Sequence, residues 1–312
     1  MRFRVAVIGG GGNVGASVGA YLAESGLADV VLIDILEGVP QGKALDLTQA
    51  GPLRGANAVL IGSNSLDDVR GADVVVVTAG FPRKPGMSRS DLLKRNADIV
   101  RNAGEAVRKH APQSVLVLVT NPLDVMSYLA FRTTGFPKQR VLGMAGVLDS
   151  ARFRAFVARA LEVAAEDVQA MVLGGHGDSM VPLPRYTTVA GIPLPDLLSA
   201  EEIQELSDRT RNGGAEIVQL LQSGSAYYAP AASVVEMVRS ILLDEKRVLP
   251  CSVLLQGEYG LSDVFLGVPC VLGQRGVERV LELQLNGEEK KSLHASAAAV
   301  SKDIAELELP VA

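Results

Sequence analysis

Cysteine is scarce in this chain, since only Cys251 and Cys270 occur among its 312 residues. Two cysteines are too few for the disulfide framework of a small secreted domain, and their spacing matches no metal site. We therefore expect two buried, reduced thiols and no bound metal. The first apolar run meets Gly9 too soon for a signal peptide. Together these features predict a cytoplasmic protein.

Long apolar runs and basic clusters are also missing. No segment approaches the roughly 20 apolar residues of a membrane span. Thirty Lys and Arg stand against 35 Asp and Glu, and no long basic cluster is present that would follow a phosphate backbone. Neither a membrane nor a nucleic acid is therefore expected as a partner. With 48% hydrophobic residues the chain can bury a sizeable core, and its length suggests two domains.

Six short apolar runs, separated by helical stretches and turns, are typical of a doubly wound parallel sheet. They lie at residues 5–8, 29–34, 59–61, 74–77, 115–119 and 141–142. The predicted fold class is α/β, with an N-terminal Rossmann domain over residues 1–145 and a mixed α+β domain over residues 146–312. In the second half we expect strands at 168–173, 248–255 and 268–272. We also expect three helices in this half. One ends near residue 161, a second follows a capping box at Ser199, and a third begins at residues 286–289.

A glycine-rich turn, residues 9–15, connects the first predicted strand to a helix that Gly26 closes. The second strand ends at Asp34, 19 residues beyond Gly15 (34 − 15). Glycines let the backbone approach a pyrophosphate, the helix start offers amide donors, and the acid can accept ribose hydroxyls. The pattern predicts a dinucleotide site made by Gly10, Gly12, Asn13, Val14, Gly15 and Asp34.

Two details of this turn bear on the cofactor. Asp34, with Glu37 nearby and no arginine beside it, would repel a 2′-phosphate, which favours NAD over NADP. Four consecutive glycines also allow a second register that starts at Gly9. We choose the register that starts at Gly10 because it keeps Gly15 at the helix start.

His176 is the candidate proton carrier. The chain has three histidines, and this one alone is flanked by glycines directly after an apolar run, with Asp178 two residues later. Imidazole titrates near neutral pH and can therefore donate or accept a proton during turnover. The alternative is a loop histidine satisfied by a backbone carbonyl. His110 and His294 lie in helical stretches and are expected to be structural.

Three further patterns each leave two interpretations open. The loop at residues 78–89 carries three cations at the end of a strand, where α/β sheets bind ligands, but it could also be a solvated basic loop. Asn121 could bond a carbonyl or hydroxyl, or merely form an Asn-Pro turn. Asp149 and Arg152 share one face of a predicted helix. They are either functional residues or a surface ion pair or helix cap.

In order and approximate spacing, these motifs resemble the lactate and malate dehydrogenase family over essentially the whole chain. The motifs are the glycine turn with Asp34, residues 82–89, Asn121-Pro122, residues 148–152 and residues 174–178. The resemblance implies NAD-dependent hydride transfer at a 2-hydroxy acid. It implies that His176 is the acid/base, that Asp149 orients it, and that Arg152 binds the substrate carboxylate. The glycine turn is one residue longer than the family's usual form.

The resemblance also assigns the loop cations. It implies that Arg89 polarises the reacting carbonyl and that Arg83 selects the substrate side chain. Arginine at the selecting position marks the malate enzymes of the family, because a guanidinium can pair with the second carboxylate of oxaloacetate. We therefore expect malate and oxaloacetate as substrates, with a lactate or other 2-hydroxy acid dehydrogenase, or a non-catalytic NAD-binding protein, as alternatives.

The remaining expectations concern the cofactor contacts and the assembly. Asn96, Val119 and Asn121 are predicted to contact NAD, and Asn121 the substrate as well. Residues 37–47 and 224–230 most resemble the lactate-dehydrogenase-like malate enzymes. That branch implies a homo-oligomer, a tetramer or a dimer, and a place in the tricarboxylic acid cycle.

Overall fold

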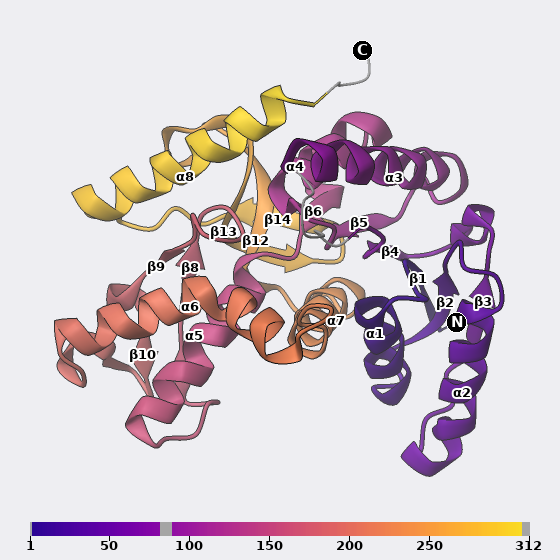
Figure 1. Cartoon of the computed structure of the whole chain (residues 1–312), viewed down its shortest axis with the longest axis horizontal. Helices are drawn as coiled ribbons and strands as arrows, with labels where there is room; N and C mark the ends of the chain where they lie inside the picture. Colours follow the sequence, from indigo (N-terminus) through magenta and orange to yellow (C-terminus); the bar gives the residue numbers. More distant parts are fainter. Residues whose placement is uncertain (1, 82–88, 308–312) are drawn as a thin grey trace.

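The computed structural model describes residues 2–81 and 89–307, with the side chains of residues 89 and 90 left aside, and its main feature is a nine-stranded sheet (Figure 1). The strand order is β14-β13-β12-β6-β5-β4-β1-β2-β3. The first six strands along the chain are mutually parallel, which confirms the predicted doubly wound sheet. They are β1 (Phe3–Ile8), β2 (Ala28–Ile33), β3 (Leu60–Ser63), β4 (Val74–Val77), β5 (Val115–Leu118) and β6 (Val141–Gly143).

Helices cover both faces of this parallel part, which is why its central strands are apolar on both sides. All four valines of β4 are buried, for example. In Figure 1, α3 and α4 lie on one side of the sheet, and α1 and α2 on the other. The four helices are α1 (Asn13–Glu24), α2 (Val39–Arg54), α3 (Arg89–His110) and α4 (Leu123–Thr134).

Three long antiparallel strands continue the sheet beyond β6. They are β12 (Arg247–Gln256), β13 (Ser262–Gly273) and β14 (Gly276–Val280), and β12 joins β6 where Ser252 pairs with Gly143. The predicted strand at 248–255 matches β12, whereas β13 begins six residues before the predicted 268 (268 − 262). One sheet therefore carries side chains from both halves of the chain to a common region.

The second half adds four helices: α5 (Gly146–Leu161), α6 (Ala200–Leu221), α7 (Tyr228–Leu242) and α8 (Gly287–Ala305). The predicted capping box at Ser199 is present, and the predicted helix start at residues 286–289 contains a capping box as well. Ser199 and Glu202 exchange bonds with each other's backbone at the start of α6, and Asn286 and Glu289 do the same at α8. Single 3-10 turns occur at η1 (Leu66–Val69), η2 (Lys138–Arg140), η3 (Pro184–Tyr186), η4 (Leu194–Asp196) and η5 (Glu258–Gly260).

The prediction of one strand at residues 168–173 is wrong. Two short strands replace it, because the chain leaves one small sheet and enters another at Ala170 and Met171. The first sheet contains β7 (Val168–Gln169), β10 (Thr188–Val189) and β11 (Ile192–Pro193), and the second contains β8 (Val172–Leu173) and β9 (Val181–Pro182). An apolar run alone does not reveal such a change of partner.

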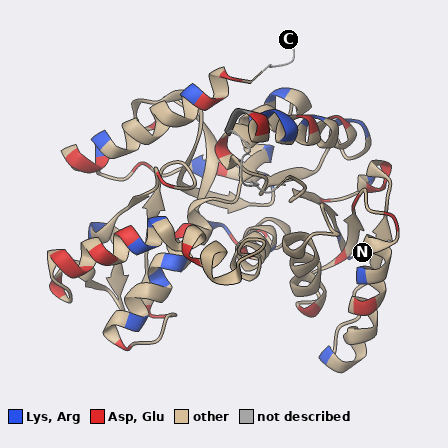
Figure 2. Ribbon diagram, in the orientation of Figure 1, with Lys and Arg blue, Asp and Glu red and all other residues tan. Residues whose placement is uncertain are grey.

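The distribution of charged residues in the structure agrees with the lack of a long basic cluster in the sequence. In the view of Figure 2, basic and acidic residues mix along the outer helices, and α6 carries ion pairs such as Arg209–Glu216. Within residues 2–81 and 89–307, no helix is long and apolar enough to cross a membrane. Cys251 and Cys270 are free and buried, as predicted.

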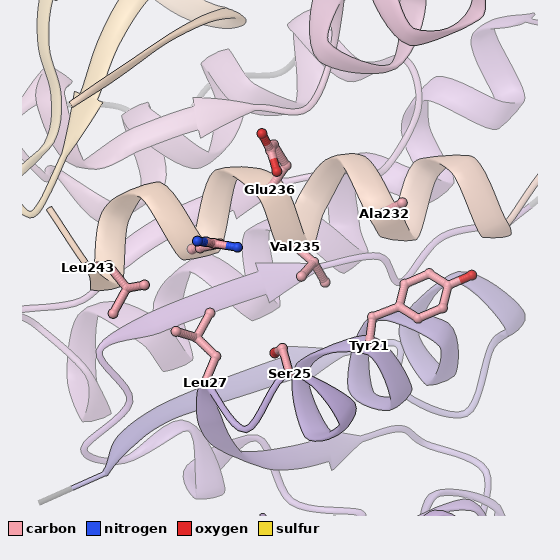
Figure 3. A pocket seen from close by; sticks show the side chains of 8 residues that line it. Tyr21, Ser25, Leu27, Ala232, Val235, Glu236 and Leu243 are labelled. Atoms are coloured by element: carbon pink, nitrogen blue, oxygen red, sulfur yellow. The ribbon is translucent and has the colours of Figure 1, made fainter. Parts of the chain in front are cut away.

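A groove of about 510 Å³ lies between α1 and α7 (Figure 3). Tyr21, Ser25 and Leu27 line it from the α1 side, and Val235 and Leu243 from the α7 side. None of the predicted site residues lies among its lining residues. The groove is therefore not the candidate site, which has to be built from the residues that carry the chemistry.

Candidate active site

His176 lies on the loop after β8, and its side chain is 15% exposed. Its Nδ1 is 2.9 Å from Oδ2 of Asp149 in α5. A carboxylate at Nδ1 fixes the proton on that nitrogen and leaves Nε2 to exchange a proton with a reacting group. The partner of His176 is thus an acid of another element and not the backbone carbonyl of the alternative interpretation. Gly174 (φ +88) and Gly177 (φ +119) supply the left-handed turns that shape this loop.

Asp149 and Arg152 lie on one face of α5, as their spacing predicts, and Arg152 Nη1 is 3.3 Å from Asp149 Oδ1. Their side chains are only 2% and 12% exposed, so they are not a surface ion pair. Two glycines of α6 leave room for the guanidinium: a Cβ at Gly213 would lie 3.3 Å from Arg152 Cδ, and one at Gly214 3.6 Å from Nη2. Among the described residues Arg152 Nε has no hydrogen-bond partner. The guanidinium therefore keeps donors available for an anion.

Charge and burial act in opposite directions on the His176 imidazole. Burial lowers its pKa, but the charge of Asp149 and the hydrogen bond to Nδ1 together outweigh burial, so the pKa lies above the usual 6.5. Burial likewise lowers the pKa of Arg152, and Asp149 opposes this. The arrangement favours the protonated imidazole, which can donate its proton to a carbonyl oxygen.

Asp124, an acid in the first turn of α4 that was not predicted from the sequence, is buried and only 4% exposed. Its Oδ2 accepts the backbone N–H of His176 at 2.8 Å, and its Oδ1 accepts the hydroxyl of Ser252 at 2.7 Å. Burial has the largest effect and raises the pKa of Asp124 above its usual value, although these two hydrogen bonds lower it. In the sequence, Asp124 is recognisable only as an acid three residues after Asn121. An acid at that place commonly stabilises the first turn of a helix.

Ser296 of α8 was missed as well. Its Oγ accepts the backbone N–H of Gly175 at 2.8 Å and lies 3.0 Å from Ser179 Oγ. Two consecutive amides of the histidine loop are therefore bound by side chains from other elements. No local pattern marks Ser296, since it lies 121 residues away along the chain.

The glycine turn leaves no space for side chains where the predicted cofactor site requires close approach. A Cβ at Gly15 would lie 2.4 Å from the carbonyl oxygen of Gly9, and Gly9 itself has a left-handed φ of +92°. Gly12 is the N-cap of α1, so the first free amides of the helix follow it directly. Gly15 thus occupies the position of close helix–strand packing in the register that starts at Gly10.

Asp34 directly follows β2 and lies beside this turn. Its Oδ2 accepts the N–H of Gly11 at 3.0 Å, and a Cβ at Gly11 would lie 2.8 Å from the Asp34 Cγ. Gly11 therefore has no side chain at the place where the Asp34 carboxylate lies. Asn13 is exposed and Val14 half-buried in the first turn of α1. These residues fit a dinucleotide that approaches the ends of β1 and β2.

Of the other predicted contacts, Val119 and Asn121 follow β5, and Asn96 lies in α3. Asn96 is 1% exposed, and its amide bonds to backbone: Oδ1 accepts Phe81 N–H at 2.8 Å and Nδ2 donates to the Asn121 carbonyl at 2.7 Å. Asn96 thereby joins the base of the loop after β4 to the end of β5. Asn121 is exposed and precedes a cis peptide bond to Pro122, and Val119 is half-buried.

Two predicted residues cannot be placed with the others. Arg83 lies outside the described residues, and Arg89 is described only as the first residue of α3. His110 and His294 have structural partners, as predicted. His110 Nε2 lies 2.9 Å from Asp67, and His294 Nε2 lies 3.0 Å from the carbonyl oxygen of Tyr259.

Comparison with known proteins agrees with this geometry. Residues 3–143 match the family described as lactate/malate dehydrogenase, NAD binding domain, and residues 146–309 match the alpha/beta C-terminal domain of the same family. The chain belongs to the lactate/malate dehydrogenase family, and its N-terminal half contains the NAD-binding domain that the glycine turn predicts.

Individual relatives narrow the comparison. The chain is 55% identical to the malate dehydrogenase of Roseiflexus sp. (strain RS-1), over 98% of this chain and 99% of the relative. A crystal structure of Cryptosporidium parvum malate dehydrogenase superposes with a TM-score of 0.96 at 44% identity, covering 99% of both chains. The lactate dehydrogenase of C. parvum, complexed with lactic acid and NAD, gives a TM-score of 0.95 at 42% identity and the same coverage. Fold similarity alone therefore does not separate malate from lactate.

Proposed function

We propose that this chain is an NAD-dependent malate dehydrogenase that interconverts (S)-malate and oxaloacetate. The observation that carries the proposal is the group formed by the buried Asp149 and the half-buried His176 and Arg152, joined by contacts of 2.9 Å and 3.3 Å. Oxidising a 2-hydroxy acid requires a proton acceptor for the hydroxyl and a cation for the carboxylate. One hydrogen-bonded group offers both.

The residues that would hold the cofactor are those of the glycine turn, Gly10, Gly12, Asn13, Val14 and Gly15, together with Asp34, Asn96, Val119 and Asn121. NAD, when bound, supplies the acceptor for the hydride that malate loses. The glycines let the backbone approach the pyrophosphate, and the start of α1 directs free amides toward it. Asp34 accepts the ribose hydroxyls and disfavours a 2′-phosphate.

The proton chemistry belongs to His176. In malate oxidation, neutral Nε2 accepts the hydroxyl proton, and Asp149 stabilises the imidazolium that forms. In oxaloacetate reduction, the same nitrogen donates the proton to the carbonyl oxygen. Malate oxidation should therefore fall as pH decreases through the pKa of His176, and oxaloacetate reduction should fall as pH increases through it.

Three arginines place and polarise the substrate in this proposal. Arg152 pairs with the carboxylate next to the reacting carbon, and Asn121 bonds the substrate from the end of β5. Arg89 stabilises negative charge on the reacting oxygen, which is where preorganised charge lowers the barrier most. Arg83 pairs with the second carboxylate, which malate has and lactate lacks. Arg83, together with the malate dehydrogenases among the relatives, favours malate over lactate.

A His176→Asn variant tests the proton role. We expect NADH affinity close to that of the wild type and a loss of turnover in both directions, because asparagine cannot carry the proton. A variant that turns over normally would refute the assignment. If the wild type binds NADH but reduces no 2-keto acid, the non-catalytic alternative is correct.

Substituting Arg83 by glutamine tests the substrate assignment. We expect the preference for oxaloacetate over pyruvate to decrease strongly, because the second carboxylate loses its bidentate partner. An Arg83→Gln enzyme with unchanged preference would contradict the role of this residue.

The wider setting is also part of the proposal. The N-terminal domain ends near residue 145, and the enzyme acts in the cytoplasm, in the tricarboxylic acid cycle, as a homotetramer or homodimer without a nucleic-acid or membrane partner. Sedimentation velocity of the purified chain distinguishes the two assemblies from a monomer.

A further inference from the structure

Among the residues that the structure describes, Asp124 is the one buried acid beside His176 to which the proposed reaction assigns no role. It lies in α4, which packs on β12 and β13 (Figure 1). Its two oxygens accept hydrogen bonds from two different segments: Oδ2 from His176 N–H at 2.8 Å and Oδ1 from Ser252 Oγ at 2.7 Å. Neither donor belongs to α4, so the contacts do not serve as a helix cap.

We propose that Asp124 is a positioning residue for the proton transfer, whose carboxylate fixes the backbone of His176 and adds a second negative charge beside the Asp149 pair. The role rests on the proposed function, in which His176 carries the proton. Asp124 contacts neither ring nitrogen of His176. It acts through its hydrogen bond to the loop backbone and through its charge.

Three observations support the first half of this role, the fixing of the backbone. The contact is buried, so water does not compete for the His176 N–H. Gly175 makes the approach possible, because a Cβ there would lie 3.3 Å from Asp124 Oδ2. Ser296 binds the preceding amide of Gly175, so two neighbouring amides are held from α4 and α8.

The second half concerns charge. The charged groups that face His176 are Asp149 and Arg152 from α5 and Asp124 from α4, while α8 contributes the uncharged Ser296. Asp149 raises the pKa of His176 most strongly, Arg152 lowers it, and Asp124 raises it further. Both oxygens of Asp124 accept bonds from donors, which is the pattern that an ionised carboxylate prefers. The carboxylate therefore partly offsets the effect of Arg152 on the imidazolium.

The test is the pKa of His176 measured by NMR on histidine-labelled full-length protein, wild type against Asp124→Asn. An asparagine keeps both hydrogen bonds, since its oxygen can accept from His176 N–H and its nitrogen can donate to Ser252 Oγ. Only the charge is lost. We expect the pKa of His176 to fall by about one unit, with the other two histidines as internal references that do not move.

Two further variants complete the design. Asp178→Asn is the matched control, because Asp178 is an exposed acid of the same loop and its charge is screened by solvent. In this variant the pKa of His176 should equal that of the wild type. Asp124→Ser removes the same charge with a smaller side chain, in case the asparagine variant does not fold. NADH affinity and thermal unfolding report the folded state of each variant.

Turnover provides the second readout. In Asp124→Asn, the pH limbs of oxaloacetate reduction and malate oxidation should both move to lower pH by the same amount, with the KM of oxaloacetate unchanged. An unshifted His176 pKa in a folded neutral variant, whatever its thermal stability, would overturn the role of Asp124. The titration requires no turnover, so it still tests Asp124 if neither oxaloacetate nor malate proves to be a substrate.

Discussion

Replacing Asp149 with asparagine removes the charge that both His176 and Arg152 face, at 2.9 Å and 3.3 Å. The amide oxygen can still accept the Nδ1 proton, so the variant isolates the charge from the hydrogen bond. Asp149 contributes the largest effect that raises the pKa of His176, and burial, which lowers it, would remain. An opposite charge at this distance shifts a pKa by about 1–3 units, so we expect a fall of about 2 units.

This shift sets the size of the kinetic effect. Two pKa units correspond to about 2.7 kcal/mol of lost preference for the imidazolium. At pH above both pKa values, the protonated fraction and hence oxaloacetate reduction should decrease about 100-fold. The KM of oxaloacetate should also rise, because Arg152 loses the partner that orients it. NADH affinity should not change, since the glycine turn and Asp34 lie on other elements.

The assay is the initial rate in both directions from about pH 5 to about pH 9, about two units on either side of neutrality, which covers both limbs. The Asp178→Asn enzyme serves as the matched control for loss of a carboxylate. A folded Asp149→Asn enzyme whose pH limbs coincide with those of the wild type would refute the electrostatic account of the site.

Three other predictions follow from the same geometry. In Arg152→Lys, the KM of the 2-keto acid should rise about 10- to 100-fold at unchanged NADH affinity, because a charge-assisted bidentate contact is lost; an unchanged KM in steady-state kinetics would contradict this. Gly15→Ala should destabilise the fold by about 1–3 kcal/mol in denaturant unfolding, because its Cβ would meet the Gly9 carbonyl oxygen at 2.4 Å. Gly42→Ala, a helical control with nothing within 4 Å, should stabilise it by about 0.4–1 kcal/mol, and equal effects of the two would refute the packing argument. The folded pKa of His176 is raised, so its contribution to stability should be complete below its unfolded pKa near 6.5 and be lost as pH rises through the higher folded value. The difference in the free energy of unfolding between the wild type and His176→Asn should therefore decrease as pH rises over that range. A difference that stays constant with pH would count against the raised pKa.

The parallel sheet could be predicted from the sequence because its central strands are buried on both faces. Residues 74–77 are four consecutive valines, and the predicted strand has the bounds of β4. The capping boxes at Ser199 and Asn286 were equally readable, since the bonding partners lie three residues apart. The strand at 168–173 failed because its two halves have different partners, which depends on long-range packing.

The site shows the same division between local and long-range information. The spacing of Asp149 and Arg152 predicts a shared helix face, and α5 has it. The contact of Asp149 with His176 spans 27 residues, and only the family resemblance suggested it. Asp124 reaches Ser252 across 128 residues, and nothing local distinguishes it from an ordinary acid at a helix start.

The most direct test of the central claim is NADH oxidation by the purified protein, with oxaloacetate and pyruvate compared side by side and each repeated with NADPH. We predict strong preference for oxaloacetate with NADH. Preference for pyruvate would transfer the chain to lactate chemistry, with the roles of His176 and Arg152 intact and that of Arg83 refuted. Activity with neither 2-keto acid would contradict the proposed function itself.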